Sequence, residues 1–259
     1  MKRALAIATV LCLVLPATPA LAETVQGGGV RVAFSGKLSP TKLPRQGEAP
    51  VSVTVGGRIF TVDGSPPPRL RAIEIAINRA GRFDFAGLPR CTYAEIQPST
   101  TAAAQAACGA AKVGEGTFAA DVLLPEQSPF PSQGKIVAFN GTEKGKPVIL
   151  AHVYGTVPIP LSYTLVLRVA ETRGKGTFAT VLRASLPEVI PGVAYITGIS
   201  LTLDRRFTVA GRTRGYISAG CPAPAGFPGA SFALLRASFS FEDAPTLSST
   251  LNRSCRARG

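Results

Sequence analysis

Apolar and polar residues alternate along most of the chain with the period of two that is typical of β-strands. In 70–79, Ile73, Ile75 and Ile77 fall on one face, and a tight turn at 80–81 followed by 82–85 predicts a hairpin. The predicted strands are 30–35, 51–55, 58–62, 70–79, 112–124, 135–140, 147–155, 161–171, 176–186, 193–204, 206–210, 214–219, 231–241 and 246–254. Many short strands at this spacing predict an all-β fold, an antiparallel β-sandwich.

One segment carries a helical signal. Thr92 and Glu95 have the spacing of a capping box, in which each residue satisfies a backbone N–H group of the first helical turn. The alanine-rich stretch 102–107 follows, and Gly109 is well placed to end a short helix. The pattern predicts a short helical insertion at 92–108, between two strands.

The start of the chain has the pattern of a secretory signal peptide. A charged start precedes an apolar stretch over 4–15 and a small-x-small cleavage site at 20–22. We therefore expect removal of 1–22 and a secreted protein of residues 23–259, extracellular or associated with the cell wall. It would form one compact unit, or two packed lobes that meet near 125–134. No other apolar stretch approaches the roughly 20 residues of a membrane helix, so no membrane span is expected after cleavage.

Four cysteines remain after this cleavage, an even number in a chain bound for an oxidising compartment. The more local pairing joins Cys91 to Cys108 and Cys221 to Cys255, and it is one of three possible connectivities. In the chain-entropy model the first bond stabilises the fold by about 3 kcal/mol. A zinc site would need closely spaced pairs such as C-x-x-C, which are absent. The pattern therefore predicts two disulfides, with no metal and no cofactor.

The sequence offers little catalytic chemistry. His152 is the single histidine, and as a general base it would need a nucleophile and an orienting carboxylate brought near it by the fold. The carboxylates available in principle are Asp84, Asp121, Asp204 and Asp243. A lone histidine on an apolar strand is more often a packing residue. We therefore expect a non-enzymatic protein, and an extracellular hydrolase centred on His152 is the alternative.

A formal charge of +13 favours anionic partners through long-range attraction. We expect an anionic cell-wall polymer or polysaccharide, and no specific nucleic acid. If the strands from 135 onward form a meander, alternate turns share one end of the sheet, and one such end is basic while the other is rich in proline. The candidate anion-binding residues are Lys144, Lys146, Arg173, Lys175, Arg205 and Arg206. The alternative is that they only occupy exposed hairpin tips, where neighbouring acidic residues weaken the field.

Several short segments resemble a group of secreted actinobacterial proteins to which no activity is assigned. They lie at 88–91, 106–109, 113–116, 151–155, 220–224 and 247–251, and include three of the four cysteines. The resemblance spans roughly 50 to 255. It implies a secreted β-rich scaffold with two disulfides and assigns no catalytic residue.

Overall fold

The computed structural model describes residues 22–97, 99–157, 160–172, 174–186 and 193–258, so the predicted signal peptide, apart from its last residue, lies outside it. The strands are β1 (Glu23–Gly27), β2 (Val30–Ser39), β3 (Lys42–Pro44), β4 (Ala49–Pro50), β5 (Ser52–Thr61), β6 (Leu70–Asn78), β7 (Gly81–Phe83), β8 (Lys112–Val122), β9 (Phe130–Glu143), β10 (Lys146–Gly155), β11 (Leu161–Glu171), β12 (Phe178–Ser185), β13 (Ala194–Leu203), β14 (Arg206–Val209), β15 (Arg212–Gly215), β16 (Ile217–Ala219), β17 (Gly229–Phe241) and β18 (Leu247–Arg258). The helices are α1 (Tyr93–Ile96), α2 (Thr101–Cys108) and the 3₁₀ turn η1 (Gly109–Ala111).

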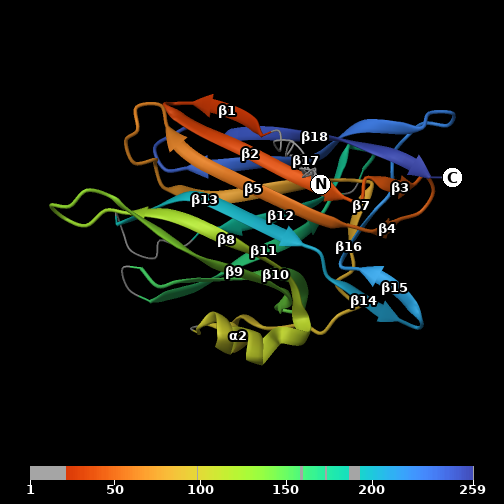
Figure 1. The fold of residues 1–259 in the computed structure, drawn as a ribbon, viewed down its shortest axis with the longest axis horizontal. Helices are drawn as coiled ribbons and strands as arrows, with labels where there is room; N and C mark the ends of the chain where they lie inside the picture. The colour runs from red at the N-terminus through yellow and green to blue at the C-terminus, as the bar shows by residue number, and fades with distance from the viewer. Residues whose placement is uncertain (1–21, 98, 158–159, 173, 187–192, 259) are drawn as a thin grey trace, which may run out of the picture.

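Thirteen strands form one strongly curled sheet, a half-barrel, in the order β1-β2-β5-β13-β8-β9-β10-β11-β12-β6-β17-β18-β3 (Figure 1). All neighbours are antiparallel except β18 and β3, which are parallel. The all-β prediction is confirmed. The predicted sandwich is not, because thirteen of the strands are hydrogen-bonded in one continuous sheet instead of being divided between two packed sheets, and the other five described strands form a two-stranded and a three-stranded sheet.

Glycines allow this curvature at points where neighbouring strands approach each other closely. A Cβ atom on Gly116 of β8 would lie 1.9 Å from the carbonyl oxygen of Ser200, and one on Gly134 of β9 would lie 2.2 Å from that of Tyr154. Real side chains cannot approach a backbone so closely. The sheet can therefore coil at β8 and β9 only because glycine occupies these positions.

The order of the strands differs from two predictions, the meander from 135 onward and the hairpin over 70–85. Strands β9 to β12 do follow one another as antiparallel neighbours, but β13 returns to lie between β5 and β8. The predicted hairpin over 70–85 is wrong, since β7 pairs with β16 instead of β6. Strand β6 is already bonded to β12 on one edge and to β17 on the other, so it has no free edge for β7.

The two ends of the curled sheet approach each other at β2 and β18. The Nε of Arg253 on β18 donates a hydrogen bond of 2.8 Å to the carbonyl oxygen of Gly36 on β2. Phe34 and Phe239 meet edge-to-face in the interior, with ring centroids 5.8 Å apart. The apolar faces of the strands thus enclose one large core, in which Phe239 lies buried.

The helical insertion covers part of the outer face of β9 and β10. Ile96 and Ala104 of the helices pack against Phe139 and Leu150, which point away from the main core and form a second apolar cluster. The predicted capping box is present, with the Thr92 N–H group 2.6 Å from a Glu95 carboxylate oxygen. The insertion is also anchored to the rest of the fold.

Those anchors are covalent and polar. The predicted disulfides Cys91–Cys108 and Cys221–Cys255 are both present, with Cα–Cα distances of 5.8 and 5.7 Å. Beside the first, the buried Asn140 amide donates to the carbonyl oxygens of Phe85, Leu88 and Pro89 at 3.0–3.2 Å. One side chain therefore satisfies three backbone acceptors of the loop that leads from β7 to the insertion.

Candidate functional site

Three basic turns lie at the same end of the curled sheet. Val148 of β10 pairs with Arg168 of β11, so the β9–β10 and β11–β12 turns project in the same direction. Strand β13 ends there too, because Leu203 pairs with Gly114 at the start of β8, next to the last part of β9. The expected clustering of these turns at one end is therefore found, although β13 reaches it by another route.

The exposed cations at these turns form a surface that we call the basic rim. Its members are Lys144, Lys146, Lys175, Arg205 and Arg206. Arg173, predicted with them, lies outside the described residues. Lys144 has a φ of 50° and the following Gly145 a φ of 76°, the left-handed pair that closes a tight hairpin and projects the lysine outward.

The acidic residue next to these lysines is already paired. Both oxygens of Glu143 accept hydrogen bonds from Arg168, at 2.7 and 2.8 Å. The bonds from this guanidinium hold the pKa of the Glu143 carboxyl below its usual range. Among the described residues, no carboxylate comes within salt-bridge distance of Lys144 or Lys146. The charge of Glu143 is thus compensated along the sheet, and both lysines face solvent.

A polar cleft of about 270 Å³ opens at the same end, where Figure 1 shows the β14–β15 hairpin beside β7 and β16. Arg82 of β7 pairs with Ser218 of β16, which pairs with Pro50 of β4, and this row crosses the three-stranded sheet that borders the cleft. The polar residues that line it are Glu48, Arg82, Asp84, Thr213, Arg214 and Ser218. Because Arg206 of the basic rim pairs with Gly215, which lines the cleft, the cleft lies next to this part of the rim.

One wall of this cleft is held in place by its own contacts. Arg214 lies 3.3 Å from one oxygen of Asp84, and the Gly87 N–H group donates to the other at 3.0 Å. A Cβ atom on Gly215 would lie 2.5 Å from the carbonyl oxygen of Ile217, so glycine lets the hairpin fold tightly onto the strand that follows it. This part of the cleft is therefore preformed.

His152 lies away from this end, on the outer face of β10. Its side chain is fully buried and neither ring nitrogen has a hydrogen-bond partner among the described residues. It pairs with Thr164 on β11, whose hydroxyl lies 3.1 Å from the side-chain oxygen of Gln97 at the end of α1. Burial lowers the pKa of the imidazole from its usual 6.5, so the ring is neutral at pH 7. The helical insertion thus covers His152 from solvent.

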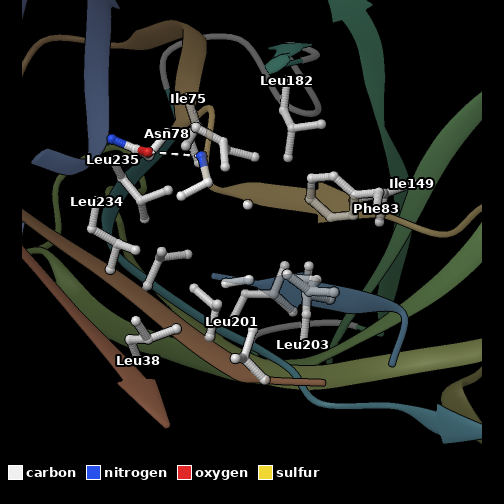
Figure 2. Close-up of a pocket in the computed structure, with 18 of the residues that line it drawn as sticks. Leu38, Ile75, Asn78, Phe83, Ile149, Leu182, Leu201, Leu203, Leu234 and Leu235 are labelled. Atoms are coloured by element: carbon white, nitrogen blue, oxygen red, sulfur yellow. Dashed lines mark hydrogen bonds between the residues drawn. The ribbon is translucent and has the colours of Figure 1, made fainter. Parts of the chain in front are cut away.

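The interior of the half-barrel contains an apolar cavity of about 60 Å³ (Figure 2). Ile75, Leu182, Leu203 and Leu235 point into it, and the one polar side chain there, Asn78, donates to the carbonyl oxygen of Ala233. A cavity that binds benzene measures about 150 Å³. This void is much smaller, so it is a packing defect instead of a ligand site.

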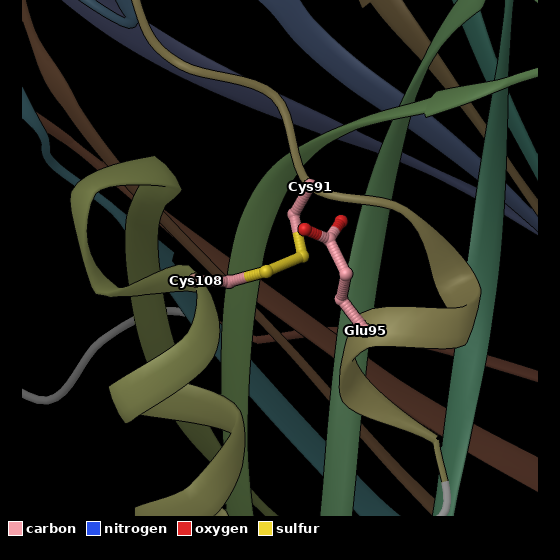
Figure 3. A group of neighbouring side chains, drawn as sticks. All are labelled: Cys91, Glu95 and Cys108. Carbon is pink, nitrogen blue, oxygen red and sulfur yellow. A yellow bond between two sulfur atoms is a disulfide. The ribbon is translucent and has the colours of Figure 1, made fainter.

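Cys91, Cys108 and Glu95 lie together and could resemble a metal-binding group (Figure 3). The two sulfur atoms are bonded to each other, so no thiolate is available. The Glu95 carboxylate accepts from Thr92, whose hydrogen bonds lower its pKa. These residues therefore clamp the insertion and cap its first helix.

Comparison of the chain with protein-family models, with curated proteins and with solved structures gives no match. The resemblance to secreted actinobacterial proteins receives no support from these comparisons. Within the described residues, no helix has the length and apolar character to cross a membrane. The disulfides suggest an oxidising compartment.

The cleft is the feature that sequence reasoning missed. Its residues come from the segment before β4, from β7 and the residue after it, and from the β15–β16 region. Arg82, Asp84 and Arg214 form no recognisable motif, and their approach depends on the pairing of β7 with β16. The one local signal was the charge of the β14–β15 hairpin, whose strands carry Arg206, Arg212 and Arg214.

Proposed function

We propose that this protein is a secreted, non-enzymatic binding module that holds anionic extracellular material, such as a cell-wall polymer or polysaccharide, on its basic rim. The observation that carries this proposal is the gathering of three basic turns at one end of the sheet. The turns at β9–β10 and β11–β12 are separated by two strand spacings, about 10 Å. That distance is close to the Debye length at 0.1 M salt, about 10 Å, so the fields of neighbouring turns overlap.

The pairing of nearby charges supports the same reading. Glu143 is compensated by Arg168, which leaves Lys144 and Lys146 available to a polyanion. A linear polymer with regularly spaced negative charges could follow these turns along the end of the sheet. Each contact would be solvent-exposed and individually weak, so binding would depend on several contacts at once and on ionic strength.

The packing of His152 weighs against the hydrolase alternative. A general base needs a nucleophile and an orienting group in hydrogen-bonding distance, together with access for substrate. The buried ring of His152 has no hydrogen-bonding partner within the described part of the chain. Its paired neighbours on the two adjacent strands are Val137 and Thr164, and neither of them is a carboxylate.

The test is retention on an immobilised polyanion and co-sedimentation with isolated cell walls, at low and high salt. We expect retention at low salt that collapses at high salt. The triple variant Lys144→Gln, Lys146→Gln, Lys175→Gln should elute at clearly lower salt than the native protein. The matched control Arg31→Gln, Arg58→Gln, Lys135→Gln removes the same charge away from the rim. Its salt concentration at elution should fall much less. An equal fall in the salt concentration at elution in the two triple variants would refute the proposal. No retention of the native protein would refute it too.

A further inference from the structure

The polar cleft differs from the basic rim in its balance of charge. Arg82 and Arg214 bring two positive charges, and Glu48 and Asp84 bring two negative ones, so the formal charges of the lining cancel. Thr213 and Ser218 add hydroxyl groups. The cleft therefore offers charged donors, charged acceptors and neutral groups that can do both. A site built only to attract phosphate would not contain two carboxylates.

The partners of these groups divide the cleft into two parts. Asp84 and Arg214 hold each other, and Gly87 supports Asp84 from behind. Arg82 and Glu48 are exposed, and neither has an ion-pair partner among the residues that the structure describes. Arg82 is thus free to bind a carboxylate with two parallel hydrogen bonds, and Glu48 is free to accept from hydroxyl groups.

We infer that the cleft holds one acidic sugar unit of an anionic polysaccharide, with the sugar carboxylate on Arg82 and its hydroxyl groups on Glu48 and Asp84. This inference rests on the proposed function, because the rim beside the cleft would bind the rest of the polymer. A uronic-acid unit carries both a carboxylate and hydroxyl donors, which match the cationic and anionic parts of the lining. A polyphosphate has acceptors only, and Glu48 and Asp84 repel it.

The volume of the cleft agrees with a single small unit. About 270 Å³ lies just below the lower limit of pockets that enclose drug-sized ligands, about 300 Å³. The cleft is open to solvent at the same end as the rim, so the neighbouring units of a polymer can leave it on both sides. One unit is held in the cleft while the others contact exposed cations.

The decisive experiment compares retention on polygalacturonate and on polyphosphate at equal salt. Simple electrostatics requires that Glu48→Gln strengthen binding to both polymers, because it removes a repelling charge. The inference requires the opposite sign for polygalacturonate, a loss of about three- to tenfold, since a charged acceptor for hydroxyl groups is removed. Polyphosphate binding should stay equal or increase. Glu126→Gln, at the other end of the molecule, removes the same charge and should change neither. Stronger retention of the Glu48→Gln variant on both polymers would overturn the inference.

The monosaccharide separates this inference from the proposed function. Galacturonate added to the ¹⁵N-labelled protein should shift the amide signals of Thr213 and Ser218, and Arg82→Gln should abolish those shifts. Shifts without polymer retention would support the cleft and reject the rim. Polymer retention with no shift at the cleft, from either the monosaccharide or short oligomers, would reject the cleft and keep the rim.

Discussion

Filling the interior cavity provides a quantitative test of the packing. Val53 of β5 lines the void, and Val53→Ile adds one methylene group while keeping the β-branched shape that suits a strand. At about 24 cal/mol per Å³, an empty volume of 60 Å³ costs the fold about 1.4 kcal/mol. One buried methylene recovers about 0.8 kcal/mol. We expect the free energy of unfolding to rise by about that amount, which corresponds to about 2–3 °C in melting temperature for a chain of this size.

The assay is urea and thermal unfolding of the oxidised protein, with Val113→Ile as the matched control. Val113 is 1% exposed and does not border the cavity, so the same added methylene should overpack its surroundings and cost about 1–3 kcal/mol. The two identical changes are therefore expected to have opposite signs. If Val53→Ile destabilises the protein as Val113→Ile does, the void cannot accept a methyl group and the reasoning fails.

Two further predictions concern buried polar side chains. Because burial lowers the pKa of His152 below its unfolded value of 6.5, the unfolded state binds the proton more readily. The contribution of the neutral ring to the free energy of unfolding is present above pH 6.5 and is lost as the pH falls. His152→Leu should therefore reduce the drop in the free energy of unfolding between pH 7.5 and 5.5, measured by urea titration. An unchanged drop would contradict this. Asn140→Leu removes the donor shared by three carbonyl groups and should cost roughly 2–4 kcal/mol, whereas Asn252→Leu, at an exposed position on β18, should cost under about 1 kcal/mol. Equal losses in these two variants would show that the three hydrogen bonds do not stabilise the loop.

Local patterns in the sequence were sufficient to predict most of the elements. The alternation in 161–171 predicted β11 with its observed bounds, and the capping-box spacing at Thr92 predicted the first helix. The predicted strands 51–55 and 58–62 are one strand, β5, because Gly56 and Gly57 continue it at a place where glycine usually signals a turn. Three short strands, β1, β3 and β4, were missed, since they carry little alternation and two of them are three residues or fewer.

The arrangement of those elements was much less predictable. A period of two indicates that a strand has an inner and an outer face, but it does not indicate which strands are neighbours. Pairing of β6 with β17, and of β13 with β5, depends on contacts between distant parts of the chain. The same limit applies to the site. The turns of the basic rim were found because they are local, while the cleft was missed because it joins segments that only the folded sheet brings together.

The position of β18 also determines when folding can finish. Asn78 at the end of β6 bonds to Ala233 of β17, 155 residues later, and β17 in turn needs β18 on its other edge. A chain that is made from its N-terminus therefore cannot complete its sheet until its final 12-residue strand has emerged. Cys255 lies in that strand, so the second disulfide can form only after β18 has reached an oxidising environment. Completion of the sheet and closure of this disulfide thus both wait for the same strand.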